Sequence, residues 1–270
     1  MPASAVRRRP IDLRRREFLA ALALGAASAL AGCTTASPMP RRPRTTSFSP
    51  PPHIPPPRPG RTSSFTHGPA HTAEIALTID DGYDADTVAA YVKLAHDTGL
   101  PLTFNPIGKL AHIWQPHAPL LRPLIEKNQI QIANHTYNHL LLPELSDAEV
   151  TSEIEQNEAW IESTFGVTAR PYLRPPSGQR DRRVDTIAGN LGFTKIVLWQ
   201  GTFGDAVPVT PDHLLALARQ ALVPGSIVVG HANQGTVTSL YPQLVEIIRE
   251  RKLVPVTLDA MFGTSRAAGA

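Results

Sequence analysis

The sequence predicts an α/β fold with a mainly parallel sheet, and three observations support this prediction. Short apolar runs alternate with amphipathic segments from Glu74 onward, which is the pattern of βα units. The amphipathic segments begin and end at residues that cap helices. Polar residues follow nearly every apolar run, at the edge where parallel α/β barrels carry their chemistry. The number of βα units is the evidence for a barrel.

Seven apolar runs are predicted to be strands: residues 74–79, 102–105, 130–133, 171–173, 194–199, 226–229 and 253–257. A helix is expected over residues 86–98, ended by Gly99, and the longest helix begins at a capping box, Ser146 to Glu149, and ends at Gly166. Thr210-Pro211 begins another helix. The longest helix presents a helical stripe that predicts core packing, with one polar member: Val150, Ile154, Asn157, Ile161 and Phe165.

The first 32 residues are predicted to be an export signal. Arginines precede a short, alanine-rich apolar run over residues 20–31, which is well below the ~20 residues that span a bilayer. Arg15-Arg16 with Phe18-Leu19 resembles a twin-arginine signal, although general secretion remains open. Leu30 to Cys33 resembles a bacterial lipobox, which implies cleavage before Cys33 and lipidation of its sulfur. We therefore expect an exported lipoprotein, anchored in the cell membrane through Cys33 and displayed on the cell surface.

Residues 33–71 are expected to form a disordered, proline-rich linker. Eleven of the 27 prolines lie between Thr34 and Ala70. Charge divides unevenly: residues 1–32 carry +4, residues 33–70 carry +5, and residues from 71 onward hold 15 basic and 21 acidic residues. The body is therefore acidic and lacks the positive surface that nucleic acids require. Cys33 is the only cysteine, so no internal disulfide can form.

A histidine pair follows the apolar run that ends at Ala133. If the chain is helical there, His135 and His139 lie one above the other with Cβ atoms about 5–6 Å apart. That spacing allows both imidazoles to bind one ion at a Zn–N distance of about 2.0–2.1 Å, but a catalytic zinc needs three protein ligands. Asp80 and Asp81, at the end of the first strand, could supply the third ligand and a base. Alone, Asp-Asp-Gly is also typical of a tight turn.

Residues at the ends of other predicted strands could supply a partner for Asp80 and a general acid. Arg174 could pair with Asp80 or form a structural ion pair, and His231 could be a general acid or a buried neutral histidine. Asp205 is placed to contact one of these two. A different interpretation makes Ser177, His231 and Asp205 a serine-hydrolase triad, but no G-x-S-x-G motif surrounds Ser177.

Four separated motifs resemble, in order, those of the polysaccharide deacetylases of carbohydrate esterase family 4: Thr78-Ile79-Asp80-Asp81-Gly82, His135-Thr136-Tyr137-Asn138-His139, Arg174-Pro175-Pro176-Ser177-Gly178 and Val229-Gly230-His231. The resemblance covers about residues 72–260. It implies a distorted seven-stranded (β/α) barrel, similar to a TIM barrel, over residues 72–265. It also implies a divalent-metal hydrolase that removes acetyl from N-acetylated sugars.

The resemblance also implies a role for each matching residue. It makes Asp80 the base, Arg174 the partner of the base, and His231 the acid, with Asp205 beside it. The metal ligands would be Asp81, His135 and His139, and the ion would be zinc, with cobalt, nickel and manganese left open. The backbone N–H of Ser177 would help to bind the oxyanion, and Trp199 would contact the substrate.

The chain departs from the family pattern at the wall of the acetyl pocket. The family often has Asp-x-x-Asp-Trp after the fifth strand, where this chain has Thr202, Asp205 and Ala206. Ser177 stands where Tyr or Phe is usual, and Val229 where Leu is. These changes leave the choice of glycan open.

The expected substrate is an N-acetylated envelope polysaccharide of the peptidoglycan type, with acetylated xylan and chitin-type oligomers as alternatives. A catalytically silent lipoprotein that binds cell-wall carbohydrate is the competing class. We expect a monomer with no nucleic-acid partner.

Overall fold

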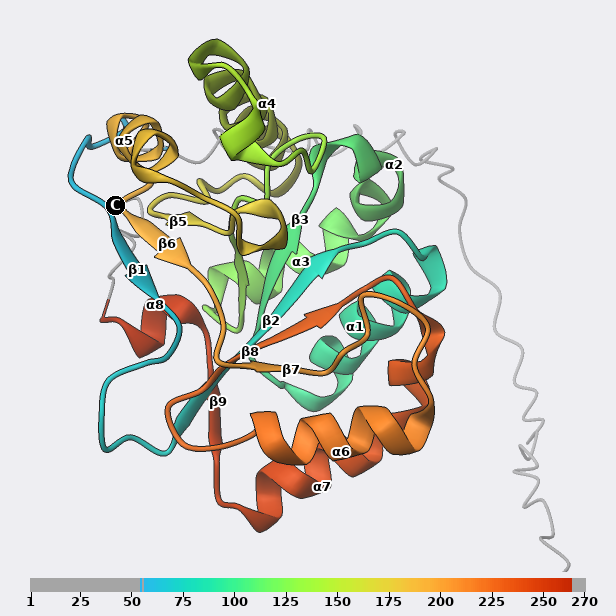
Figure 1. The fold of residues 1–270 in the computed structure, drawn as a ribbon. Coiled ribbons are helices and arrows are strands. Elements are labelled where there is room, and N and C mark those ends of the chain that lie inside the picture. Colours follow the sequence, from blue (N-terminus) through green and yellow to red (C-terminus); the bar gives the residue numbers. More distant parts are fainter. Residues whose placement is uncertain (1–53, 55, 264–270) are drawn as a thin grey trace, which may run out of the picture. The chain divides into compact units, whose positions relative to one another are not determined.

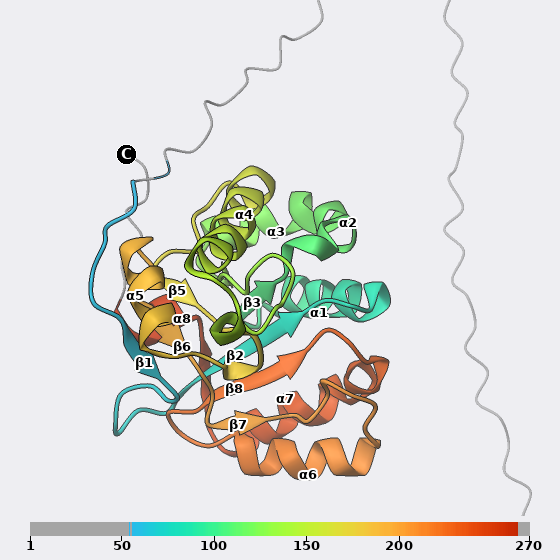
Figure 2. The same cartoon turned by 45° about the horizontal axis from the view of Figure 1, so that its top comes forward.

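The structure is a computed structural model that describes residue 54 and residues 56–263. The predicted export signal, Cys33 and most of the predicted linker lie outside these residues. The described part is an α/β fold in which every pairing between strands is parallel, as predicted. Helices lie around the outside of the strands, with α2, α3 and α4 along one flank and α6 and α7 along another (Figures 1 and 2).

The strands form two sheets. One has the order β4-β3-β2-β8-β7, with β9 also paired to β2, and the other has the order β1-β6-β5. Their bounds are β1 Ser63–Phe65, β2 Glu74–Asp81, β3 Leu102–Pro106, β4 Ile130–Ile132, β5 Tyr172–Leu173, β6 Lys195–Val197, β7 Gly201–Thr202, β8 Ile227–His231 and β9 Val254–Val256. Each predicted strand is therefore present, within a few residues of its expected bounds.

The helices begin and end where the caps predict. In α4, Ser146 and Glu149 form the predicted capping box, and Gly99 and Gly166 end α1 and α4 in the left-handed conformation. Thr210 caps α6. The bounds are α1 Ala85–Thr98, α2 Ala111–Trp114, α3 Ala118–Glu126, α4 Asp147–Phe165, α5 Arg182–Asn190, α6 Pro211–Ala221, α7 Tyr241–Glu250 and α8 Leu258–Met261.

The two sheets are arranged as an incomplete barrel. An isolated parallel bridge between Asn134 and Leu173 joins the end of β4 to β5, and the chain passes directly from β6 to β7. The ladder of strand pairs therefore does not close into one continuous sheet. The predicted seventh strand, β9, occupies no place of its own in the ring, because it pairs with Glu74–Ala76 at the start of β2 while β3 pairs with Thr78–Asp81.

The folded body begins earlier than predicted. We expected residues 33–71 to be a disordered linker, but within the described part of that range β1 pairs in parallel with β6. The Gly60 N–H donates a hydrogen bond to the Gly189 carbonyl at 3.0 Å, and His67 forms an antiparallel bridge with Ser226. This strand leaves little sign in the sequence, because the segment is rich in serine, threonine and proline and Phe65 is the only large apolar residue of β1.

The central strand β2 is buried from Ile75 to Asp81, so its carboxyl end leaves two aspartates inside the protein. Strands covered on both faces are typical of parallel sheets. The large core cluster joins this strand to α1, α3 and α4, and it includes Phe104 and Trp114. Among the residues that the structure describes, no helix combines the length and the apolar character needed to cross a membrane.

Candidate active site and metal centre

The polar residues predicted at the strand ends meet in one cleft. Asp80 and Asp81 end β2, His135 and His139 follow β4, and His231 ends β8. Side chains from all three regions line the cleft. The other lining residues come from the segment after β2, the turn at residues 176–178, the segment from β6 to α6, and β8 with the residues that follow it: Tyr83, Ser177, Trp199, Thr202, Ala206, Val229, Asn233 and Gln234. The parallel arrangement thus brings together residues that lie about 150 positions apart in the sequence.

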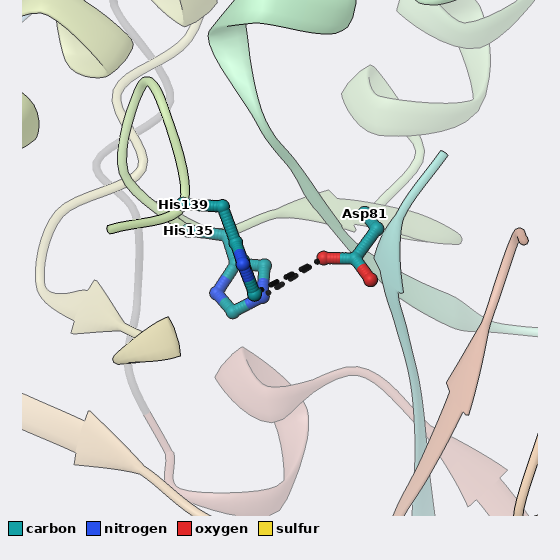
Figure 3. A group of neighbouring side chains, drawn as sticks. All are labelled: Asp81, His135 and His139. Atoms are coloured by element: carbon teal, nitrogen blue, oxygen red, sulfur yellow. Dashed lines mark ion pairs between the residues drawn. The ribbon is translucent and has the colours of Figure 1, made fainter. Parts of the chain in front are cut away.

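Three side chains form a compact group at the bottom of this cleft. Oδ1 of Asp81 lies 3.3 Å from Nε2 of His135 and 3.4 Å from Nε2 of His139. All three atoms lie within 4.8 Å of one another, and Figure 3 shows both imidazoles pointing toward the Asp81 carboxylate. Asp81 and His135 are buried, while the His139 side chain is 24% exposed.

This group fits a metal ion. Two ligand atoms that are each about 2.1 Å from a tetrahedral ion lie about 3.4 Å apart, which matches both carboxylate–imidazole distances. The buried Oδ1 of Asp81 has no hydrogen-bond partner among the described residues, whereas its Oδ2 accepts a bond of 2.7 Å from the Asn233 amide. A buried carboxylate oxygen without a donor is what a cation would satisfy.

The hydrogen bond of His135 fixes which ring nitrogen faces the group. Its Nδ1 lies 2.6 Å from the carbonyl oxygen of Arg174 and must donate, because a carbonyl only accepts. A neutral ring then presents the Nε2 lone pair to Asp81 and to an ion. Burial and the neighbouring His135 lower the pKa of His139 by more than Asp81 and Asp80 raise it, which favours the neutral form of His139. Burial alone would raise the pKa of Asp81, but the two imidazoles, when protonated, and the hydrogen bond from Asn233 lower it.

The loop that carries the histidines is not helical, so the helical arrangement that their spacing would allow is not the one present. Residues 135–141 contain no helix, and Thr136 and His139 have φ of 64° and 61°. The imidazole centroids are nevertheless 4.8 Å apart. Asp81 and Ser177 also have left-handed backbone, with φ of 68° and 54°. Such strain, of order 1–3 kcal/mol per residue, concentrates at functional sites.

Asp80 is held by the groups around it. Nη1 of Arg174 donates to its Oδ1 at 2.9 Å and its Oδ2 at 2.8 Å, and the Asn105 amide donates to Oδ1 at 2.6 Å. Burial would raise the pKa of Asp80, but the Arg174 guanidinium and the nearby histidines lower it. Arg174 is itself fully buried and donates to the Val197 carbonyl and the Thr78 hydroxyl. Asp80 is therefore an ionised carboxylate in a fixed orientation.

His231 has a different partner. Oδ1 of the fully buried Asp205 lies 3.2 Å from Nδ1 of His231, and it also accepts the His231 backbone N–H at 3.1 Å. Burial lowers the pKa of His231, but the Asp205 hydrogen bond and the charges of Asp80 and Asp205 outweigh it, so the pKa is raised. Asp205 therefore contacts His231 rather than Arg174, and it favours the protonated ring.

The predicted substrate-binding residues also lie at the cleft. Ser177 is the middle residue of η4 (Pro176–Gly178), whose turn bonds are donated by Gly178 and Gln179. The Arg174 guanidinium lies 5.3 Å from the centre of the Trp199 ring. No hydrogen bond joins the Ser177 hydroxyl to His231 within the described residues, so a serine triad lacks the contact between nucleophile and base.

Sequence reasoning missed several residues that support the site. Asn233 holds Asp81, Nε1 of Trp114 donates to the Asp81 carbonyl at 3.0 Å, and Glu153 binds the histidine loop. Asn233 could have been found from its place just after His231 at a strand end. Trp114 and Glu153 carry no such signal, since both lie on helices far along the chain from the residues they contact.

Comparison with known families gives one match that covers much of the body. A family model described as polysaccharide deacetylase matches residues 67–196. A peptidoglycan-N-acetylglucosamine deacetylase of Bacillus cereus is 26% identical over 204 residues, which are 74% of this chain and 72% of that protein. Chitin deacetylase 1 of Saccharomyces cerevisiae is 32% identical over 139 residues, which are 52% of this chain but only 43% of the yeast protein.

Among solved structures, a family 4 carbohydrate esterase pseudoenzyme from Bacillus anthracis has a similar fold. Its TM-score is 0.65 at 19% identity, and the match covers 74% of this chain and 68% of that one. Structural similarity at this level of identity supports the fold alone. The function of this chain therefore has to be inferred from the side chains in the cleft.

Proposed function

Because this chain belongs to the polysaccharide deacetylase family, we propose that it is a metal-dependent hydrolase that removes acetyl groups from N-acetylated polysaccharide. One observation carries the proposal. Asp81, His135 and His139 present three ligand atoms within 4.8 Å of one another, in the cleft that also holds Asp80 and His231. Ligands, a base and an acid are therefore all within reach of one bound acetamide.

The three ligand residues would hold a divalent ion, and a three-residue set leaves a coordination position open as catalytic sites require. When bound, the ion would polarise the acetamide carbonyl and make a nearby water easier to deprotonate. The ion most consistent with two imidazoles and one carboxylate is zinc, while cobalt, nickel and manganese also accept these ligands.

Asp80 is the proposed base. It is ionised, and Arg174 and Asn105 hold its carboxylate so that it cannot rotate freely. In the reaction it would accept the proton of the water that attacks the acetamide carbon. The water oxygen then bonds to that carbon, and the carbonyl becomes an oxyanion, toward which the Ser177 N–H would donate. Such preorganised donors are worth about 2.7–4 kcal/mol each when removed.

His231 is the proposed acid. Its raised pKa favours the imidazolium, and its Nδ1 is engaged by Asp205, so Nε2 is the atom that can donate a proton. Collapse of the oxyanion breaks the carbon–nitrogen bond, and the departing amine takes this proton. The products are acetate and a free amino sugar.

We propose an envelope polysaccharide of the peptidoglycan type as the substrate. The support is the predicted export signal with its lipobox at Cys33, which lies outside the described residues and would anchor the protein to the membrane at the cell surface. The Bacillus cereus relative is named for peptidoglycan N-acetylglucosamine and the yeast relative for chitin, so chitin-type oligomers and xylan stay as alternatives.

A non-catalytic wall-binding lipoprotein is the competing proposal, because a pseudoenzyme shares this fold. Against it stands the complete set of ligand, base and acid side chains in the cleft.

The test is acetate release from acetylated glycans, measured together with bound metal. Purified protein is incubated with peptidoglycan, chitin oligomers and acetylated xylan, with and without chelator. We expect release that stops on chelation and returns when zinc is added. Protein that binds metal at the site yet releases no acetate from any of these substrates would support the non-catalytic alternative. Sensitivity to serine-directed reagents, without sensitivity to chelators, would restore the serine-triad interpretation.

A further inference from the structure

The loop after β4 needs external support, because it holds two metal-ligand side chains without forming a helix. Thr136 and His139 adopt left-handed backbone, which is unfavourable for residues with a Cβ. The rings must still be positioned so that both Nε2 atoms reach one ion. The contacts of residues 136–138 therefore decide whether the site is preorganised.

A buried glutamate on α4 supplies the main support. Oε2 of Glu153 accepts the Asn138 backbone N–H at 2.7 Å, and Oε1 accepts the Asn138 side-chain amide at 2.7 Å. The Tyr137 N–H donates to the Glu153 carbonyl at 3.0 Å. Glu153 is only 5% exposed, so these bonds form away from solvent, where charge-assisted hydrogen bonds are strong.

The turn after β3 also supports this loop. Nζ of Lys109 donates to the Asn138 carbonyl at 2.8 Å, and the Lys109 backbone N–H donates to the Tyr137 carbonyl at 2.9 Å. Gly108 allows this approach, since a Cβ there would lie 2.2 Å from the Tyr137 ring. The N–H, amide and carbonyl of Asn138, the residue before His139, are thus all engaged.

We propose that Glu153 is a positioning residue for the metal centre, which acts through Asn138 on His139. Both of its partners are N–H donors, so both of its oxygens must accept, and only a carboxylate can do this. A glutamine would turn an amide donor toward one of these N–H groups. This inference rests on the metal site of the proposed function, but its readout is metal affinity and not acetate release.

Glu158 provides a matched control. It lies on the same helix and is equally buried, at 2% exposed. Its carboxylate binds the Thr168 hydroxyl, the Ala169 N–H and the Arg170 guanidinium, all far along the chain from the histidine loop. Glu158→Gln therefore removes a buried carboxylate of the same type without touching the loop. Any general effect of such a loss on stability will be present in both variants.

The experiment measures zinc affinity of the metal-free protein, by competition with a chromogenic chelator, for the unchanged protein, Glu153→Gln and Glu158→Gln. Loss of a group bonded directly to a metal ligand typically costs 10–100-fold in affinity. Glu153 acts through Asn138 and not on a ligand directly, so we expect a loss at the lower end of this range, about tenfold, for Glu153→Gln, and affinity within about threefold of the unchanged protein for Glu158→Gln. Near-ultraviolet circular dichroism and thermal unfolding in chelator check that each variant is folded.

The outcomes separate this inference from the proposed function. An unchanged protein that binds neither zinc nor cobalt, nickel or manganese refutes the metal site itself. A folded Glu153→Gln variant with normal affinity, or a Glu158→Gln variant weakened equally, overturns the positioning role alone. If Glu153→Gln does not fold, Asn138→Ala decides, because it removes the side-chain half of the contact. Weakened zinc binding in that variant supports the role, and unchanged binding overturns it.

Discussion

The loop after β4 and the carboxyl end of β8 both bring imidazoles to the same cleft, yet they prepare them for opposite tasks. Nδ1 of His135 donates to a backbone carbonyl, that of Arg174, at 2.6 Å. Nδ1 of His231 lies 3.2 Å from the carboxylate of Asp205. A carbonyl orients the ring without adding a full charge, whereas a buried carboxylate stabilises the imidazolium.

The difference shows in the pKa of the histidines at the two places. Burial and the neighbouring His135 lower the pKa of His139, which lies in the first region, and the charges of Asp81 and Asp80 offset this only in part. His231 is also buried, but Asp205 raises its pKa. A carboxylate bonded to Nδ1 thus distinguishes His231, which is suited to donate a proton, from His135, whose Nδ1 faces a carbonyl and whose Nε2 is suited to bind metal. Removing a side chain from each region in turn tests this distinction.

The largest effect is expected from His135→Ala. This variant removes one of three ligands, so both bound zinc and acetate release should fall to background. Zinc is measured by elemental analysis of the purified protein, and release is measured on the substrate that the unchanged protein prefers. His213→Ala, an exposed histidine on α6, is the control and should change neither quantity. Retention of stoichiometric zinc by His135→Ala would contradict the ligand role.

His231→Ala should separate the two properties. The zinc content is expected to stay that of the unchanged protein, while kcat falls by about 10²–10⁴-fold, the usual contribution of a general acid. Elemental analysis and steady-state kinetics on the same preparation provide the comparison. If zinc is lost to the same extent as in His135→Ala, the two regions do not have separate functions.

Asp205→Asn should give a smaller and pH-dependent effect. The proposed reaction needs His231 protonated, so activity should decline as pH rises through the pKa of that ring. Without the Asp205 charge only Asp80 and Asp81 still raise the pKa of His231, while burial still lowers it, so the pKa should fall. The alkaline limb of the kcat/KM profile should therefore move to lower pH, with zinc affinity unchanged. A limb that stays in place would show that another group titrates there.

The smallest effect is expected from Ser146→Ala, which alters neither region. The Ser146 hydroxyl caps α4, the helix that carries Glu153, and loss of such a cap costs about 1 kcal/mol of stability. Urea unfolding should show this decrease, with unchanged zinc affinity and an unchanged pH profile. An altered zinc affinity would mean that the start of α4 influences the histidine loop more than the local contacts indicate.

The sequence was informative where local rules apply. Alternating apolar runs placed the strands, and Ser146, Gly99 and Gly166 placed helix ends that the structure confirms. It failed where distant partners decide the conformation. The i, i+4 spacing of His135 and His139 did not decide whether the chain is helical there, and Glu153 and Lys109 hold an irregular loop. The one polar member of the stripe on α4, Asn157, donates to the Asn134 side chain and the Pro106 carbonyl.

Strand number and closure could not be read from the sequence either. Seven apolar runs predicted a barrel of seven strands. In the structure β9 pairs only with the first residues of β2, and β1 comes from a segment that was predicted to be a linker. Which strands pair depends on which strand edges the rest of the fold leaves free. That is decided by residues throughout the chain and not by the strand's own sequence.

The sequence by itself determined which reactive side chains the protein has and at which edge of the sheet they lie. Parallel strands place the residues that follow them at one common edge. The sequence therefore determined that Asp80, Asp81 and the histidines would meet. Only the tertiary structure decided what each would be, because the protonation and orientation of a side chain depend on the atom beside it. Those atoms, the Arg174 carbonyl for His135 and the Asp205 carboxylate for His231, come from other parts of the chain.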